Sequence, residues 1–385
     1  MGFFDNMIGS EKDLSSVVRF WPVLLLSFIC AFTATWLCKK IALKFGIVDR
    51  PDNLVKTHKE PVAYLGGIGI LAGLIAGVFA GIYVLVDMPD FAEALKWLIG
   101  ILAGAAIACL VGVVDDIFDI KPRLKIFGQI LAAIALLLVG IRPDLSHFLS
   151  PFGIQIPKNI DFFLGIPIVI VFVLGSTNSL NLLDGLDGLC GGVTAIITVA
   201  MLLLAVHLVT CGPYDLADPV RIIICLGLVG SVCGFLPFNR YPAKIFMGDA
   251  GSMLLGFSVA TLMILFARHS PRWWMASILV MGLPILDTAV ALARRWLNKK
   301  PLFVSDRGHL YDQMFDRGAS LKKTVRICYF LAGLYALLGI FITQIRTRFS
   351  AAIFLLVILI SIVVVWKKGY LKMKGLRGAT QNRSD

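Results

Sequence analysis

Residues 350–366 read SAAIFLLVILISIVVVW and contain no charged side chain. A helix of about 20 apolar residues spans the hydrocarbon core of a bilayer, and apolar runs of similar length recur from end to end of this chain. Of its 385 residues, 58% are hydrophobic and 16% are charged, and the mean hydropathy is +0.87. A soluble domain of this size needs far more polar surface. The composition therefore predicts an all-α polytopic membrane protein.

Eleven segments are predicted to be transmembrane helices, and the fifth of them has only about 14 residues. They are residues 17–38, 65–86, 97–114, 124–141, 162–175, 190–210, 220–236, 251–267, 273–293, 325–344 and 350–366. Neither an internal repeat nor a Pro/Ser-rich linker divides the chain. We therefore expect one membrane domain, 1–385, whose motif-bearing core covers about residues 40–320.

Lys and Arg residues indicate the orientation. Most of them fall in the C-terminal tail and in the loops after the first, third, fifth, seventh and ninth predicted helices. Loops rich in positive charge stay in the cytoplasm, so the N-terminus is expected outside and the C-terminus inside. The same rule accounts for the net charge of +12 without a nucleic-acid partner. The distinctive polar clusters fall on this cytoplasmic side, as in an enzyme that takes one substrate from the cytosol and another from the inner leaflet.

The first polar cluster is Asp115-Asp116, at the inner end of the third predicted helix. Adjacent carboxylates repel each other and are costly at a membrane boundary. Their presence is explained if a cation or a proton transfer needs them. The alternative is an acidic helix end neutralised by Lys121, Arg123 and Lys125.

The second cluster contains Asn178, Asn181 and Asp184, which recur every three residues and on a helix would share one side. Asp184 and Asp187 each precede a glycine, which lets the backbone approach a ligand closely. A polar turn between two helices is the alternative, but it does not explain three ordered repeats in an apolar stretch. This segment is therefore interpreted as a binding site.

The third cluster is the turn Gly-Asp249-Ala-Gly-Ser252, which leads into the eighth predicted helix. A helix N-terminus with free backbone N–H groups favours a diphosphate, and Asp249 could hold a metal there. An N-cap role is compatible with both. The eight cysteines form no CxxC pair, so neither zinc nor redox chemistry is indicated. Together, the clusters predict phosphoryl transfer with Mg²⁺, or alternatively Mn²⁺.

In type and order these motifs resemble those of the polyprenyl-phosphate N-acetylhexosamine-1-phosphate transferases of glycosyltransferase family 4. This family includes the undecaprenyl-phosphate GlcNAc-1-phosphate transferases and the phospho-MurNAc-pentapeptide translocase. Five motifs carry the resemblance: the basic loop KTHKEPVAYLGG at residues 56–67, Asp115-Asp116, residues 178–187, the turn at residues 248–252 and a loop containing His309.

The resemblance implies a role for each matching residue. Asp115 is the base that deprotonates the lipid phosphate, with Asp116 as its partner, and His309 contacts the phosphate or the sugar; these three form the catalytic set. Asp249 and Asp184 are the implied Mg²⁺ ligands. The implied substrate-binding residues are Lys59, Asn178, Asn181, Asp184, Asp187 and Arg307.

The implied reaction moves a sugar 1-phosphate, first of all GlcNAc-1-phosphate, from a UDP-sugar to undecaprenyl phosphate and releases UMP. It would initiate lipid-linked cell-envelope polysaccharide synthesis, such as that of O-antigen, in a bacterial inner membrane. The expected partners are the UDP-sugar, undecaprenyl phosphate and membrane lipids, and a homodimer is one option. Another UDP-HexNAc or UDP-MurNAc-pentapeptide is the alternative donor for the same chemistry.

One departure concerns the last motif, where many GlcNAc-1-phosphate transferases read His-x-His-His and this chain has His309-Leu-Tyr311-Asp312. Because this loop lies where the sugar should sit, Tyr311 and Asp312 are expected to shape sugar selectivity. The alternative is that His309, Tyr311 and Asp312 only pack the loop and cap a short helix.

Two other classes of protein are alternatives to a transferase. A secondary transporter or lipid flippase is favoured by acids inside the membrane, and Asp287 in the ninth predicted helix is one. A membrane phosphatase needs Arg, Ser and His at phosphate-binding spacing, which the sequence lacks.

Overall fold

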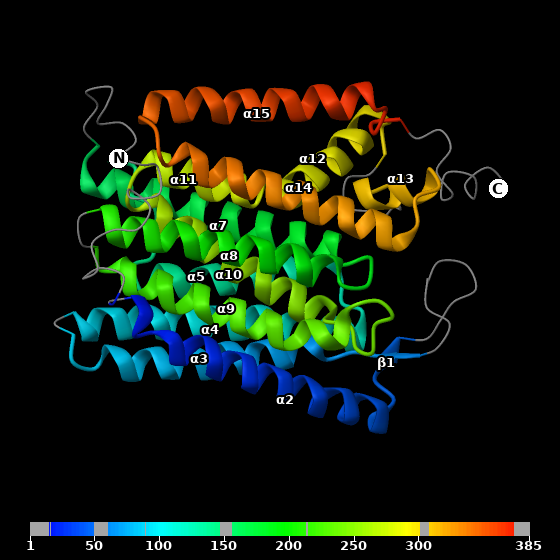
Figure 1. Ribbon diagram of the computed structural model, residues 1–385, viewed down its shortest axis with the longest axis horizontal. Coiled ribbons are helices and arrows are strands. Elements are labelled where there is room, and N and C mark those ends of the chain that lie inside the picture. Colours follow the sequence, from blue (N-terminus) through cyan, green and yellow to red (C-terminus); the bar gives the residue numbers. More distant parts are fainter. Residues whose placement is uncertain are drawn as a thin grey trace.

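A computed structural model describes residues 15, 17–49, 61–88, 90–146, 156–212, 215–300 and 308–372. In this part of the chain the helices lie side by side in one bundle, with a two-stranded sheet at one end (Figure 1). The elements are α2 Trp21–Phe45, β1 Val48–Asp49, β2 Val62–Ala63, α3 Gly66–Leu85, α4 Phe91–Phe118, α5 Pro122–Leu138, α7 Lys158–Leu183, α8 Leu189–Cys211, α9 Ala217–Asn239, α10 Gly248–Ala267, α11 Pro271–Val280, α12 Gly282–Leu297, α13 Leu310–Asp316, α14 Leu321–Ile342 and α15 Thr347–Lys367.

The prediction of a polytopic helical membrane protein is confirmed. Among the described residues, nine helices are long and apolar enough to cross a membrane, and the pair α11–α12, bent by 71°, would make a tenth. Every one of the eleven predicted segments falls on a helix or on this bent pair. The predicted segment that is not among these ten corresponds to α5, which has only 17 residues.

One detail of the prediction is wrong. The short fifth helix is in fact the 26-residue α7, which continues through Asn178 and Asn181 because their amides find partners on neighbouring helices. The structure adds one small feature to the helical fold. The two-residue strands β1 and β2 pair antiparallel, with Val48 opposite Ala63.

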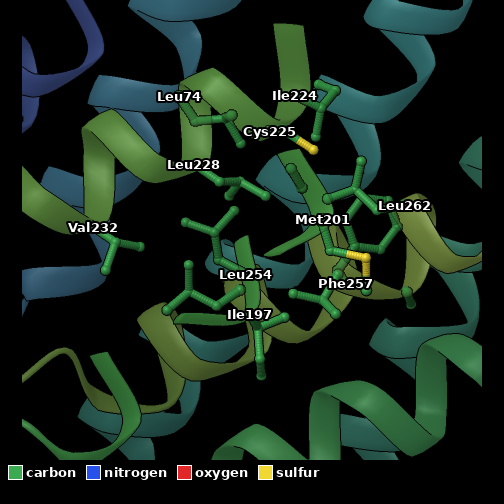
Figure 2. Close-up of a cluster of buried hydrophobic side chains, with 14 of the residues drawn as sticks. Leu74, Ile197, Met201, Ile224, Cys225, Leu228, Val232, Leu254, Phe257 and Leu262 are labelled. Carbon is green, nitrogen blue, oxygen red and sulfur yellow. The ribbon is translucent and has the colours of Figure 1, made fainter. Parts of the chain in front are cut away.

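The centre of the bundle is α10. It is apolar all round and buried along its length, as expected for a helix enclosed by others. Figure 2 shows its Leu254 and Phe257 among Leu74 of α3, Met201 of α8 and Leu228 of α9. Because α10 begins with the Gly-Asp turn, its central position places Asp249 in the middle of one end of the bundle.

Close backbone contacts fix the start of α10. The amides of Gly66 and Gly67 donate to the carbonyls of Phe246 and Met247, both at 3.0 Å. A Cβ on Gly67 would run into the backbone of Gly251, so α3 and α10 can approach this closely only without a side chain there. The start of α3, which belongs to the basic-loop motif, is therefore joined to the turn that carries Asp249.

The end of the bundle that carries β1, the start of α10 and the end of α4 is called the site end below. Both α2 and α15 finish at this end (Figure 1). α15 lies at the edge of the bundle with most of its apolar side chains exposed, as expected for a helix that faces lipid.

Candidate active site at one end of the bundle

Three helix ends bring Asp115, Lys125 and Asp249 together. The Nζ of Lys125, in the first turn of α5, donates to Asp249 Oδ2 at 2.7 Å and also pairs with Asp115 at the end of α4. The Lys125 and Asp249 side chains are 28% and 25% exposed, whereas Asp115 is 8% exposed. One ammonium thus bridges two carboxylates at a place that solution can reach. These three residues and Asp116 are called the acidic cluster.

Asp116 contacts the start of α10 directly. Its two carboxylate oxygens accept the backbone N–H groups of Asp249 at 2.8 Å and Ala250 at 3.2 Å. The prediction that this turn offers free N–H groups to a diphosphate is therefore wrong for these two amides, because a side chain of the protein occupies them. Gly248 has a φ of +67°, and a Cβ there would collide with the Asp116 carboxylate. Asp116 therefore positions Asp249, the candidate metal ligand, by holding its backbone.

The predicted helical face of Asn178 and Asn181 exists, in the last turns of α7. Asn178 Nδ2 donates to Gln129 Oε1 on α5 at 2.9 Å, and Asn181 Nδ2 donates to Ser252 Oγ on α10 at 3.0 Å. These two amides tie α7 to the helices that carry Lys125 and Asp249. They shape the floor of the site rather than projecting freely from a loop.

Asp184 and Asp187 point to different parts of the site end. Asp184 follows α7, and burial raises its pKa well above the usual range, with the charges of Asp249, Asp116 and Asp187 raising the pKa further. The protonated acid is thus favoured. Asp187 Oδ2 instead accepts the backbone N–H of Ala243 at 2.9 Å. Asp184 therefore feels the charges of the acidic cluster, whereas Asp187 holds the loop before α10.

The acidic cluster fits a divalent cation that shares its ligands with a substrate. Among the described residues no three His, Cys, Asp or Glu side chains form a ready-made cation site. Mg²⁺, however, typically takes one or two carboxylates and completes its shell with water and phosphate oxygens. Asp115 and Asp249 already converge on a cation, the ammonium of Lys125. The donor set therefore fits the expected metal.

His309 is held by an acid from another helix. Its Nδ1 lies 2.8 Å from Asp287 Oδ2 on α12, and Asp287 Oδ1 accepts the backbone N–H of Leu310 at 2.6 Å. Both side chains are buried. Asp287, which favoured a transporter in the sequence, thus has a local partner at the site end. The sequence carried one indication of this pair, namely an acid in an apolar helix followed by a single His in the next loop.

Tyr311 packs the His309 loop onto the turn after α7. Its ring stacks on His309 with centroids 5.6 Å apart, and its hydroxyl donates to the carbonyl of Leu182 at 2.9 Å. Burial raises the pKa of Tyr311 well above its usual range, so the phenol remains a donor. A Cβ on Gly185 would meet the Tyr311 hydroxyl. This arrangement agrees with the packing alternative for Tyr311.

The sequence placed Lys125 only among the basic residues that would neutralise an acidic helix end, and its pairing with Asp115 confirms this part of the alternative. Its contact with Asp249 was not predicted. Lys125 and Gln129 are four residues apart on α5 and contact Asp249 and Asn178 respectively. Two polar residues at i and i+4, in a helix that is apolar from Ile130 to its end, were the signal. Two predicted substrate-binding residues, Lys59 and Arg307, lie outside the described residues.

Comparison with known proteins adds independent findings. The model of glycosyl transferase family 4 matches residues 98–267, which include every member of the acidic cluster. The chain is 31% identical, over 94% of its length and 93% of the relative's, to the "Probable undecaprenyl-phosphate N-acetylglucosaminyl 1-phosphate transferase" of Bacillus subtilis (strain 168). It is 27% identical to the "Undecaprenyl-phosphate alpha-N-acetylglucosaminyl 1-phosphate transferase" of Yersinia pestis, over 88% and 89% of the two chains. It is 30% identical to a "Phospho-N-acetylmuramoyl-pentapeptide-transferase" of Geobacillus sp. (strain WCH70), over 83% and 98%.

Proposed function

The chain belongs to glycosyl transferase family 4, and we propose that it transfers N-acetylglucosamine 1-phosphate from UDP-N-acetylglucosamine to undecaprenyl phosphate and releases UMP. The observation that supports this most strongly is the bridge of Lys125 between Asp115 and Asp249, at the meeting point of three helix ends. The names of the Bacillus and Yersinia relatives favour undecaprenyl phosphate as the acceptor, and an N-acetylglucosamine donor over UDP-MurNAc-pentapeptide.

The reaction joins a phosphate oxygen of the lipid to the phosphorus that carries the sugar. It breaks the bond from that phosphorus to the oxygen that bridges the donor diphosphate, and this oxygen leaves with UMP. Positive charge must neutralise the donor diphosphate and the leaving UMP. Lys125 supplies such a charge from a position between two acids. Asp115, which also accepts the backbone N–H of Ile120 at 3.1 Å, takes the proton of the lipid phosphate in this proposal.

Asp249 and Asp184 are the proposed Mg²⁺ ligands, with Mn²⁺ as the alternative ion. When bound, the ion supplies charge neutralisation for the diphosphate. Asp116 keeps Asp249 in place through the first amides of α10, so its part in the reaction is positional. Burial raises the pKa of Asp184, and the charge of a bound cation would favour the ionised carboxylate that could hold it.

His309 is proposed to act on the diphosphate or the sugar. Asp287 lies in hydrogen-bonding distance of Nδ1 and orients the ring. In the proposal, Nε2 of a neutral imidazole accepts from a sugar hydroxyl, and Nε2–H of the protonated ring donates to a phosphate oxygen. With Tyr311 engaged in packing, the proposed influence on sugar selectivity rests on Asp312, the next residue of the loop.

The proposed topology has eleven crossings, an outside N-terminus and a cytoplasmic C-terminus, in a bacterial inner membrane. A 17-residue α5 is about 25 Å long, close to the roughly 30 Å of a bilayer core. In a Cys211→Ser background, Lys121→Cys at the site end should be labelled only from the cytoplasm, and Arg348→Cys at the other end only from outside. Labelling of Lys121→Cys from outside would overturn this orientation.

The decisive experiment measures UMP release by purified protein with a panel of UDP-sugars, with and without undecaprenyl phosphate. Release should require both substrates and Mg²⁺, and EDTA should abolish it. Asp249→Asn should lower the rate by orders of magnitude, whereas Asp119→Asn, an exposed acid at the end of α4, should leave it nearly unchanged. UMP release without the lipid, or equal rates in EDTA and Mg²⁺, would contradict the proposal.

A further inference from the structure

A cavity lies at the site end, between the start of α8, the end of α9 and the start of α14. Its volume is about 390 Å³. The residues that line it are Asp187, Gly188, Arg240, Tyr241, Leu321, Lys322, Val325, Arg326 and Tyr329. Asp115, Lys125 and Asp249 are not among them, so this cavity is not the acidic cluster.

The charge of the cavity wall is positive. Three of the lining side chains, those of Arg240, Lys322 and Arg326, are cationic and exposed. The one carboxylate among the described residues that line the cavity is Asp187, and one of its oxygens is occupied by the backbone N–H of Ala243. The excess of cationic groups suits an anion of phosphate type.

The cationic residues continue into an apolar face of α14. Lys322 and Arg326 are one turn apart, and Phe330, Leu334 and Leu337 follow on the same side at steps of four, four and three residues. These three apolar side chains are 70%, 44% and 67% exposed, so the stripe faces lipid in a membrane. A ligand with a phosphate and acyl chains matches the cavity and the stripe together.

We propose that this cavity binds the phosphate of an anionic diacyl phospholipid of the surrounding leaflet, with its acyl chains along α14. Basic residues at the end of a membrane helix are typical of such sites. The acceptor lipid does not fit this role, because its phosphate must reach the acidic cluster to react. A nucleotide does not account for the apolar stripe, which leads away from solution.

The bound lipid would stabilise the turn that leads from the cavity to the reaction site. Tyr329 donates its hydroxyl to the carbonyl of Gly188 at 2.6 Å, and Asp187 holds the loop before α10. Asp184, a proposed Mg²⁺ ligand, lies three residues before Asp187 and directly follows α7. A phospholipid that neutralises the three cations therefore stabilises the same turn from its outer side.

The test compares thermal unfolding midpoints of the full chain in nanodiscs of dioleoylphosphatidylcholine alone and with dioleoylphosphatidylglycerol. The variant carries Arg240→Gln, Lys322→Gln and Arg326→Gln. The matched control loses three exposed lysines at the end of α15, through Lys367→Gln, Lys368→Gln and Lys372→Gln. We expect phosphatidylglycerol to raise the midpoint by several degrees in the parent and the control, and by less than half as much in the variant.

An equal shift in the parent and the triple variant would overturn the proposal. A second result would also overturn it: undecaprenyl phosphate or UMP raises the midpoint of the parent but not of the variant, while phosphatidylglycerol raises both equally. The cavity would then be an acceptor or nucleotide site. If the triple variant does not fold in phosphatidylcholine alone, the milder Lys322→Gln/Arg326→Gln pair is judged by the same criteria. UMP release by the variant serves as a separate readout, because failure of the catalytic proposal leaves the lipid-dependent midpoint interpretable.

Discussion

Replacing Lys125 by Gln removes the positive charge from the acidic cluster while keeping a polar side chain of similar reach. In the folded protein this ammonium lies 2.7 Å from Asp249 Oδ2 and also pairs with Asp115. Without it, Asp115 and Asp249 face an incoming diphosphate with no resident positive charge between them. We therefore expect Lys125→Gln to impair the transfer reaction more than it impairs folding.

The magnitude follows from the geometry. A unit charge about 4 Å from a phosphate contributes about 4 kcal/mol at an effective dielectric constant of about 20. Because 28% of the Lys125 side chain and 25% of the Asp249 side chain are exposed, solvent screening reduces this to about 2–3 kcal/mol. Each 1.36 kcal/mol corresponds to about a tenfold change in rate, so kcat/KM should fall about 30- to 160-fold.

The assay is UMP release at varied UDP-N-acetylglucosamine and fixed undecaprenyl phosphate, together with a Mg²⁺ titration. Lys121→Gln is the matched control, because Lys121 is the exposed N-cap of the same helix, four residues before Lys125. It should change kcat/KM by less than about threefold, as surface charges contribute about 0–1 kcal/mol. The reasoning is refuted if Lys125→Gln keeps kcat/KM within threefold of the parent, or if both variants lose activity equally.

Two further predictions concern the His309 loop and the start of α10. His309→Ala should lower kcat and kcat/KM together by about 100-fold or more. Asp287→Asn should also lower kcat, without changing the KM of the substrate. If His309→Ala keeps its kcat and only loses thermal stability, His309 has a packing role. Gly248→Ala should lower the unfolding midpoint, because the alanine would have to adopt a φ of +67° and its Cβ would collide with the Asp116 carboxylate. Gly175→Ala, which has open space around it, should leave the midpoint unchanged. Equal midpoints for the two variants would contradict this.

The acidic motifs were readable from the chain because their signal is local. Asp115-Asp116, Asn181 and Asp249 stand out against apolar surroundings, and the cost of a polar group near a membrane makes each one informative. The resemblance to a family added their roles. Lys125 was not readable in the same way, because a basic residue beside a membrane helix is expected from the charge rule alone.

The sequence by itself determined the class of the protein and the segments that become helices, since hydropathy and helix length depend only on neighbouring residues. Only the tertiary structure decided which helix ends meet. Lys125 contacts Asp249 across 124 positions, and His309 contacts Asp287 from a different helix. Asp116 takes amides that the sequence left free for a phosphate. Such contacts depend on how the apolar faces pack around α10, and the order of residues along the chain does not specify that packing to within the length of a hydrogen bond.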